Sequence, residues 1–501
     1  MNRLASLLVA LLAGAALCLP AASEPLRVGS KRFTESYILA QLLAQAAAPH
    51  LPQPPEVKQG LGNTAIVHEA LRSGSIDLYP EYAGTVSLEI LKSPQPLSLS
   101  AMNQALAAQG LGAAIPLGFN DGYALAMRAA DAQRLGIASL SDLVRHPELK
   151  LGLSNEFIGR ADGWPGLARR YGLTQQPSGL DHGLSYDAIA ARQIDVMDIY
   201  TTDAKIVHLG LAVLKDDLGY FPRYDALVLY RLDVPQKFPR AWEAMQKLEG
   251  RISESTMIAM NARAELQGAA FDAIARDQLA GKAPDASAAS ANAKRSFMDK
   301  LAGPDLGRLT LQHLTLVGVS VALAAVLAVP LGLWAFPRPR ARGALLAFTG
   351  LLQTVPSLAM LAILIWAIGA IGVVPAVVAL TLYALLPILR NTVTGLAEVP
   401  LGLRDAGSAL GMSTSQRLRL VELPLAWPTI LAGIRIATAI AIGTATIAAF
   451  VGAGGYGERI VTGLAINDGE LLLAGAIPAA ALALFSEALF EVADRMGRRG
   501  R

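Results

Sequence analysis

The stretch from Gly343 to Leu389 contains no charged side chain, and it constrains the fold more than any other feature of the sequence. A helix that crosses a bilayer needs about 20 apolar residues, so this stretch is long enough for two crossings with a turn near residues 369–372. Three further apolar runs are long enough for one crossing each, and they cover residues 314–336, 428–452 and 471–490. The sequence therefore predicts an all-α membrane region with about five spans.

The arginines predict the orientation of these spans. They follow the first, third and fifth spans in three groups: Arg338, Arg340 and Arg342; Arg390, Arg404, Arg417 and Arg419; Arg495, Arg498, Arg499 and Arg501. Loops rich in Lys and Arg remain in the cytoplasm, so the part of the chain before the first span is expected outside it. Arg435 lies a short way into the fourth span, and its guanidinium is expected to extend toward the cytoplasmic face.

The N-terminus predicts export independently. Residues 1–23 combine Arg3, an apolar run and the small residues Ala21-Ala22-Ser23, a pattern typical of a signal peptide. The only cysteine, Cys18, lies inside this apolar run and is interpreted as part of it, so the exported region is expected to contain no disulfide. Whether the peptide is cleaved or kept as an anchor stays open.

Residues 24–280 alternate short β-branched runs with helical patterns, which indicates an α/β domain with mostly parallel sheets and room for two lobes. Residues 281–305 are small, polar and rich in Ala and Ser, and they are interpreted as a linker, with a helix as the alternative. Residues 306–501 are expected to form the membrane domain.

The expected cytoplasmic loop between the third and fourth spans reads RDAGSALGMSTSQRLRLVELPLAWP. It resembles the ATPase-coupling motif of bacterial ABC importer permeases, although Asp and Gly stand where that family more often has Glu and Ala. The matching positions are Asp405, Ala406, Gly407, Gly411, Val421, Leu423 and Pro424. The small residues leave one face of a short helix bare enough to enter a groove on a partner. The alternative is an amphipathic helix that lies on the membrane.

This resemblance implies a separate ABC ATPase subunit in the cytoplasm, because the chain contains no G-x-x-x-x-G-K-[ST] loop. The run GAGGYG at residues 452–457 formally matches a dinucleotide pattern, but it ends a span and is interpreted as a bend at the outer face. We expect no cofactor, no metal site and no nucleic-acid partner.

The exported region carries several motifs in a fixed order. They include VGSKRFTESYILAQLLAQ, GLGNTAIVHEALRSGSIDLYPEYAGT, NEFIGRADGWPGLARRYGL, IDVMDIYTTDAKI and DDLGYFPRYDALVLYR. In this order they resemble the substrate-binding proteins of glycine betaine, choline and carnitine importers, and QTVPSLAML resembles the permeases of the same systems. The resemblance implies a two-lobed periplasmic-binding-protein-like domain of type II, with a hinge between the lobes.

In that family, a quaternary ammonium group is held in a cage of tyrosine faces, which attract it electrostatically. The resemblance carries this role to Tyr82, Tyr123, Tyr200 and Tyr224, with Asp121 as a further contact to the cation. Tyr79, on the same expected strand as Tyr82, is expected to pack in the core.

The other end of a betaine needs a partner for its carboxylate. The resemblance assigns this role to Lys31 and Arg160, and Thr85 could add a hydroxyl contact. The alternative is that Arg160 pairs with Asp162 or Glu156 on the surface. Choline has no carboxylate, so Lys31 and Arg160 weakly favour a betaine. Ala83 stands where the more common PEYTGT has its first threonine, and the loss of this hydroxyl leaves the ligand preference open.

Together these resemblances imply a non-enzymatic subunit of an ATP-driven importer, in which a binding protein is fused to its permease. It would lie in the inner membrane as a homodimer, with the binding domain in the periplasm. In one alternative, the protein is an importer for ergothioneine or another larger betaine. In a second alternative, it is a ligand-sensing membrane receptor that does not transport its ligand.

Overall fold

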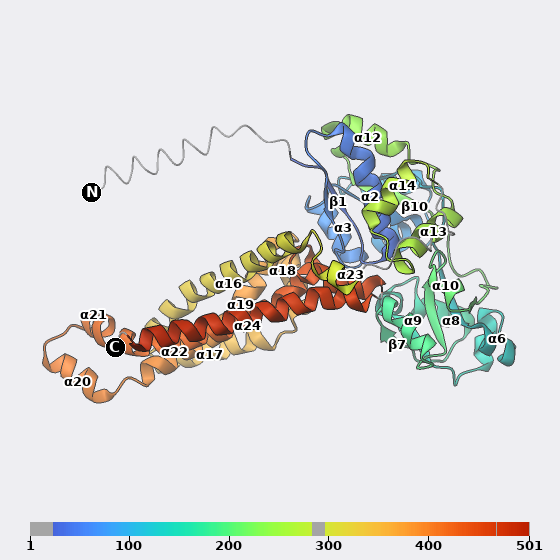
Figure 1. Ribbon diagram of the computed structural model, residues 1–501. Coiled ribbons are helices and arrows are strands. Elements are labelled where there is room, and N and C mark those ends of the chain that lie inside the picture. Colours follow the sequence, from blue (N-terminus) through green and yellow to red (C-terminus); the bar gives the residue numbers. More distant parts are fainter. Residues whose placement is uncertain (1–23, 283–295, 467, 500–501) are drawn as a thin grey trace.

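A computed structural model describes residues 24–282, 296–466 and 468–499. The expected signal peptide, residues 1–23, lies outside the described residues, and so does most of the expected linker, of which only residues 281–282 and 296–305 are described. The described chain forms a two-lobed α/β domain at one end of a long helical bundle (Figure 1).

Each lobe is built on a five-stranded sheet. The first sheet has the order β2-β1-β3-β10-β4, with β1 Arg27–Gly29, β2 Glu56–Lys58, β3 Leu78–Tyr82, β4 Leu111–Ala114 and β10 Ala226–Arg231. The second has the order β7-β6-β8-β5-β9, with β5 Tyr123–Arg128, β6 Leu151–Ser154, β7 Ser178–Leu180, β8 Val196–Tyr200 and β9 Leu211–Val213.

The expectation of mostly parallel sheets is wrong, because both sheets are mixed. In the first, β1 pairs in parallel with β2 and β3, whereas β10 is antiparallel to β3 and β4. In the second, β6 pairs in parallel with β7 and β8, whereas β5 is antiparallel to β8 and β9. The antiparallel strands β5 and β10 are those that follow the two passages of the chain from one lobe to the other. The sequence periodicity identifies strands but does not show which of them enter a sheet from the opposite lobe.

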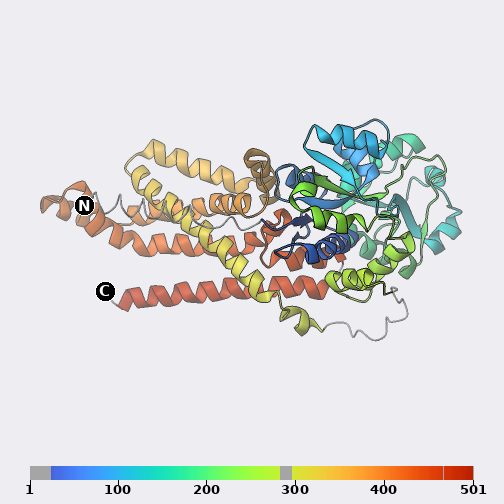
Figure 2. The same ribbon diagram turned by 90° about the horizontal axis from the view of Figure 1, so that it is seen from above.

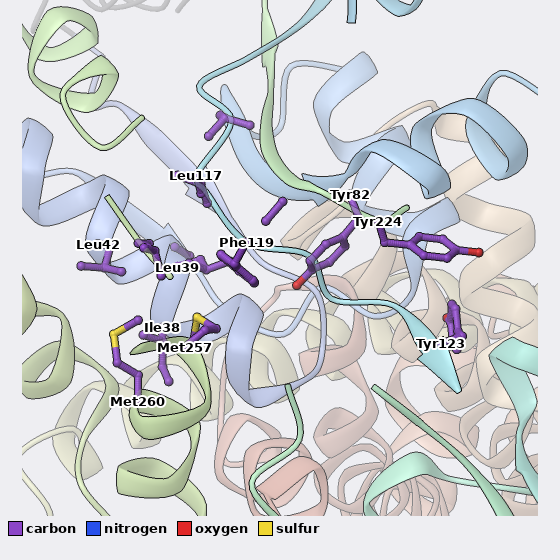
Figure 3. Close-up of a cluster of buried hydrophobic side chains, with 14 of the residues drawn as sticks. Ile38, Leu39, Leu42, Tyr82, Leu117, Phe119, Tyr123, Tyr224, Met257 and Met260 are labelled. Carbon is purple, nitrogen blue, oxygen red and sulfur yellow. The ribbon is translucent and has the colours of Figure 1, made fainter. Parts of the chain in front are cut away.

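Helices cover both sheets. They are α2 Thr34–Ala47, α3 Thr64–Arg72, α4 Ala83–Thr85, α5 Leu99–Ala107, α6 Ala129–Leu135, α7 Asn155–Gly159, α8 Trp164–Tyr171, α9 His182–Ala190, α10 Lys205–His208, α11 Val234–Lys237, α12 Pro239–Gln246, α13 Glu254–Glu265 and α14 Phe271–Leu279. The buried helix α2 packs against α12, α13 and α14, and its residues Ile38, Leu39 and Leu42 share one core cluster with Met257 and Met260 of α13 (Figure 3). The C-terminal helices therefore belong to the first lobe.

The membrane region is helical throughout its described part. Its helices are α15 Phe297–Leu301, α16 Leu306–Ala335, α17 Pro339–Thr354, α18 Ser357–Ile368, α19 Val373–Ala397, α20 Leu401–Ala409, α21 Thr414–Arg417, α22 Leu423–Thr444, α23 Gly457–Ile466 and α24 Gly469–Arg499. Among the described residues, four helices are long and apolar enough to cross a membrane, or up to five if the bent pair α17 and α18 forms one span. The pair bends by 102° at Val355-Pro356, where proline cannot donate the next helical hydrogen bond.

The two ends of the bundle differ in what they contact. The 3₁₀ helix η6, Ala445–Val451, and helix α23 face the α/β domain, whereas α20 and α21 lie at the opposite end (Figures 1 and 2). The run at residues 452–457 forms the turn between η6 and α23, with positive φ at Gly452, Gly454 and Gly455. Within the bundle, Arg435 of α22 pairs with Glu487 of α24.

Candidate functional site

Two chain segments, residues 115–122 and 214–225, connect the lobes and form a hinge. They pair through an antiparallel bridge between Asn120 and Asp225. In addition, the Tyr224 amide donates to Asn120 Oδ1 at 2.7 Å, and the Asp121 amide donates to the Tyr224 carbonyl at 3.1 Å. Two of the predicted site residues, Asp121 and Tyr224, therefore lie in the hinge itself.

Three of the four predicted tyrosines lie at strand ends beside this hinge, and Tyr224 lies in the hinge itself. Tyr123 begins β5 and lies opposite Tyr200, the last residue of β8, whereas Tyr82 ends β3 in the first lobe. The ring centroid of Tyr123 is 5.2 Å from that of Tyr200 and 5.6 Å from that of Tyr224. Figure 3 shows Tyr82, Tyr123 and Tyr224 in one cluster. The structure thus brings together residues that lie far apart in the sequence.

Phe33 completes this cluster and is absent from the sequence prediction. Its ring centroid is 6.2 Å from that of Tyr82 and 5.3 Å from that of Tyr200, so it joins Tyr82 to the other rings. Phe33 lies two positions after Lys31 within the motif VGSKRF, which could have drawn attention to it. Tyr79, by contrast, is completely buried in a separate core cluster, as expected.

Three cationic side chains face three of the tyrosine rings. Lys31 Nζ lies 5.2 Å from the ring centroid of Tyr82, and the Arg160 guanidinium lies 5.2 Å from that of Tyr123. The His182 ring lies 4.4 Å from the Tyr200 ring. Burial alone would lower the pKa of His182, but the nearby Asp203 carboxylate raises it to about 9, so the ring is cationic at neutral pH. These distances are within the range of cation–π attraction.

Lys31 and Arg160 are also paired with carboxylates of the protein. Lys31 pairs with buried Glu81. Arg160 donates to both oxygens of Asp162 at 2.8 and 2.7 Å, and to the Thr85 hydroxyl at 3.2 Å. Only 4% of Arg160 is exposed, so the pair with Asp162 forms inside the cleft and not on the surface. Asp162 also accepts from the Tyr224 hydroxyl at 2.7 Å, which ties the second lobe to the hinge.

A second feature that the sequence analysis missed is a pair of buried carboxyl groups, Glu35 and Asp121, that share one hydroxyl. The oxygen Oγ1 of Thr202 lies 2.6 Å from Glu35 Oε2 and 2.9 Å from Asp121 Oδ1. The hydroxyl has one proton and can donate to only one of them. Glu35 also accepts from the Tyr82 hydroxyl at 2.6 Å and from the Asn261 amide at 3.3 Å. Among the described residues, neither carboxyl group forms an ion pair.

Burial raises the pKa of Glu35 to about 7, and burial together with the charge of Glu35 raises the pKa of Asp121. A bound cation favours the ionised carboxylate and therefore releases a proton. We expect the affinity for a cationic solute to rise by about tenfold between pH 6 and pH 8, because the ionised fraction of a group with pKa near 7 rises by that factor. Titration at several pH values measures this rise.

Glu35→Gln is expected to abolish the pH dependence. The matched control is Glu265→Gln, because burial also raises the pKa of Glu265 to about 7, but Lys205 and His182 already compensate its charge. If the affinity of the unmodified protein stays constant from pH 6 to pH 8, the carboxylate of Glu35 does not act on the bound cation.

A cavity of about 100 Å³ lies between the lobes next to these rings. Lys31, Phe33, Glu156, His182 and Tyr200 are among the residues that line it. One further lining residue, Ala465, belongs to helix α23 of the membrane region. The cavity therefore combines aromatic faces, acidic groups and basic groups.

The predicted coupling residues lie at the far end of the bundle. Asp405, Ala406 and Gly407 are in α20, Gly411 follows it with φ of +75°, and Val421, Leu423 and Pro424 lead into α22. Asp405 and Ala406 are exposed, whereas Gly407 is buried, so it does not form part of the bare helix face that was expected. Glu422, which the sequence analysis passed over, holds the loop together, because Arg417 donates to it at 2.8 Å and to Ser408 at 2.9 Å.

A two-lobed α/β domain with aromatic and charged side chains gathered at its hinge, joined to a bundle of membrane-spanning helices, defines a binding-protein-dependent membrane transport protein. The chain belongs to the ABC-type glycine betaine transport family: residues 24–281 match its substrate-binding domain. Residues 324–498 match the inner membrane component of binding-protein-dependent transport systems. The chain is thus a binding domain fused to a permease, located in the inner membrane with the binding domain outside the cytoplasm.

Three relatives illustrate the two halves. The chain is 34% identical over 295 residues to the ergothioneine transport permease/ergothioneine binding protein of Helicobacter pylori (strain G27), covering 56% of this chain and 52% of that protein. It is 35% identical over 296 residues to the glycine-betaine-binding protein of Pseudomonas aeruginosa, and the match covers 56% of this chain and 94% of that protein. It is 44% identical over 185 residues to a carnitine transport permease protein of Listeria monocytogenes, and the match covers 37% of this chain and 82% of that protein.

Proposed function

We propose that this protein is the substrate-binding and membrane-spanning subunit of an ATP-driven importer for a quaternary-ammonium solute such as glycine betaine, choline or carnitine. Residues 24–280 capture the solute, residues 281–305 link the domains, and residues 306–501 form the pore. The observation that carries the proposal is the cluster of tyrosine rings at the hinge, three of which already face cationic groups within cation–π distance.

The charges of the site support a cationic solute. A methylated ammonium cannot donate strong hydrogen bonds, so aromatic faces and nearby carboxylates are its natural partners. Glu35 and Asp121 supply carboxylates that are not engaged in ion pairs with described residues. In this proposal Tyr82, Tyr123, Tyr200 and Tyr224 surround the cation, and Asp121 contacts it.

The recognition of a carboxylate is a separate part of the proposal. Lys31 and Arg160, with Thr85, would meet the carboxylate of a betaine, which would then compete with Glu81 and Asp162 for the same basic groups. Choline has no carboxylate and does not compete for these basic groups. On charge alone, the pairs Lys31–Glu81 and Arg160–Asp162 therefore favour choline over betaines.

Transport requires energy from a partner. Helix α20 exposes small residues at the end of the bundle opposite to the binding domain (Figure 1), where a cytoplasmic ATPase could receive it in a groove. We propose that two copies of the chain pair in the membrane on two such ATPase subunits.

Calorimetric titration of the purified full chain in lipid nanodiscs tests the choice of solute. We expect saturable binding of at least one of glycine betaine, choline and carnitine, and weaker binding of that solute to Tyr200→Ala. If none of glycine betaine, choline and carnitine gives a binding signal, the proposal is contradicted.

Ergothioneine, a larger betaine, is a second candidate. The relative named for ergothioneine transport and binding also unites permease and binding protein in its name, as this chain unites the two domains. Ergothioneine is therefore the fourth ligand of the same titration. Binding of ergothioneine that choline does not displace would favour this candidate.

A further inference from the structure

Helix α13, Glu254–Glu265, contains a buried polar side chain, Asn261, within the core of the first lobe. The helix lies after Arg231, where the last of the family-like motifs ends. Its residues Met257 and Met260 pack against α2 (Figure 3), and Asn261 itself is only 2% exposed. Asparagine is a poor helix former, and its buried amide costs free energy unless it is hydrogen-bonded. Specific partners must therefore compensate for Asn261 at this position.

The side-chain amide of Asn261 bridges two acceptors in different lobes. Its Nδ2 atom donates to Glu35 Oε2 at 3.3 Å and to the Thr202 carbonyl oxygen at 3.1 Å. Glu35 lies in the first turn of α2 in the first lobe, whereas Thr202 follows β8 in the second lobe. Because both partners accept, they must face the NH₂ group and not the amide oxygen, which determines the orientation of the amide. Asn261 therefore holds Glu35 and Thr202 in a fixed relation to each other.

The other end of the amide can be satisfied without a change of this orientation. The Oδ1 atom of Asn261 is buried and has no hydrogen-bond partner among the described residues. Asn261 also lines a small cavity of about 10 Å³, together with Glu265 and His182. This volume is about that of one water molecule, and a water bound there would donate to Oδ1. The NH₂ group thus remains available to Glu35 and Thr202.

The titratable groups around Glu35 come from every element that packs against it. They are Tyr82 of β3, Asp121 of the hinge, His182 of α9, Asp203 and Lys205 after β8, and Glu265 of α13. Burial raises the pKa of Glu35 to about 7, and the charge of Asp203 acts in the same direction. The hydrogen bond from Asn261 opposes this rise, together with those from two hydroxyl groups. Asn261 therefore helps Glu35 to ionise in an acidic environment.

We propose that Asn261 is a positioning residue for the cation-binding carboxylate, because it holds Glu35 against the second lobe and supplies a donor that its ionised form requires. The NH₂ group can only donate, so it stabilises the carboxylate and not the protonated acid. Helix α13 thus contributes to the site although its sequence lies outside the motifs that resemble a known family. The inference rests on the proposed binding of a cationic solute, but the pairing of Asn261 with Glu35 can be tested without any solute.

The pH dependence of solute affinity tests this role in the full chain in nanodiscs, with choline or glycine betaine as the probe. Asn261→Leu removes the donor at similar volume. Its affinity should be about fivefold lower than that of the unmodified chain at pH 7 and within about twofold of it at pH 9, because the loss of one hydrogen bond to a carboxylate moves the midpoint of ionisation upward by about one pH unit. Asn261→Asp keeps the shape of the side chain and should move the midpoint in the same direction, since it places another carboxyl group next to Glu35.

Gln175→Leu is the matched control. Gln175 is also a buried amide, and it donates to the carbonyls of Leu143 and His146 at 2.8 and 3.0 Å within the second lobe. Its replacement should lower thermal stability and leave the pH midpoint unchanged. A loss of affinity by the same factor at pH 7 and pH 9 in Asn261→Leu would overturn the inference, because Asn261 would then serve the structure alone. Unchanged affinity at both pH values would overturn it as well.

Thermal stability without solute separates this inference from the proposed function. The folded state raises the pKa of Glu35, so stability falls as Glu35 ionises between about pH 5 and pH 7, and without the donor the fall should continue to about pH 8. Asn261→Leu should therefore lower Tm by more at pH 9 than at pH 5, and this difference should disappear in the Glu35→Gln background.

An equal loss of Tm at pH 5 and pH 9, with Glu35 present, would overturn the inference even if a solute binds. If no solute binds to the unmodified chain, the proposed function is contradicted. The melting temperatures then decide by themselves whether Asn261 supports the ionised form of Glu35.

Discussion

Tyr123→Ala is expected to weaken the binding of a quaternary-ammonium solute by up to about 30-fold. A well-placed ring contributes roughly 0.5 to 2 kcal/mol to the binding of a cation, and 2 kcal/mol corresponds to about 30-fold. Tyr123 also contacts Tyr200, Tyr224 and Phe157, so its removal should displace neighbouring rings as well. Calorimetric titration of the full chain measures the loss.

Two further variants show whether the ring itself is responsible. Tyr123→Phe keeps the ring and should bind within about threefold of the unmodified protein, because the ring face supplies the attraction. Tyr230→Ala removes a tyrosine that packs on Trp242, away from the hinge, and should lower thermal stability without changing affinity. Equal affinities of Tyr123→Ala and the unmodified protein would show that this tyrosine serves packing only.

Ala406→Trp is expected to reduce ATP-driven uptake by more than about tenfold while solute affinity stays unchanged. Ala406 is exposed on α20, so a larger side chain can be accommodated by the loop itself. It would, however, prevent the helix from entering a groove on an ATPase subunit, and a cost of about 1.4 kcal/mol there already corresponds to a tenfold loss. Uptake and binding are measured on the same preparation.

The same variant distinguishes the two interpretations of the cytoplasmic loop. If α20 instead lies on the membrane surface, tryptophan should be tolerated, since aromatic side chains are favoured at that interface. Val207→Trp is the control, because Val207 is 85% exposed on α10, a helix of the binding domain that lies far from α20 (Figure 1). Normal uptake by Ala406→Trp would refute the coupling role.

The membrane region was predictable because the bilayer imposes a simple rule on composition. The charge-free stretch from Gly343 to Leu389 corresponds to α17, α18 and α19 and the breaks between them, and its predicted turn coincides with the break between α18 and α19 at Gly369–Gly372. The 102° bend at Val355-Pro356 was not predicted. Proline permits a bend at that point, but packing against neighbouring helices decides whether it occurs.

The tyrosines of the site could be predicted because they lie in sequence motifs that resemble those of a known family. Tyr123, Tyr200 and Tyr224 were named from three separate motifs and lie ring to ring in the structure. Glu35 lies in another of the motifs, VGSKRFTESYILAQLLAQ, yet a lone glutamate at the start of a helix is commonly exposed. Its role becomes visible only when the fold places Thr202 and Asp121 next to it.

Ion pairs in the cleft and contacts between the two domains depend on tertiary structure and could not be predicted from the sequence. Arg160 and Asp162 are two positions apart, so a surface pair was a reasonable alternative, but the fold buries both in the cleft. Gly183 has no sequence signature, because the reason for a glycine there is a carbonyl of Leu464, in the other domain. Such requirements appear only when both domains are placed in contact.

Solute uptake by proteoliposomes tests the central claim most directly. The full chain is reconstituted with its ATPase, ATP is supplied on the cytoplasmic side, and labelled glycine betaine, choline, carnitine and ergothioneine are offered on the other side. We expect ATP-dependent accumulation of at least one of the first three solutes, and its loss in Tyr123→Ala. Binding of a solute without any ATP-dependent accumulation would contradict the account and favour a ligand-sensing receptor.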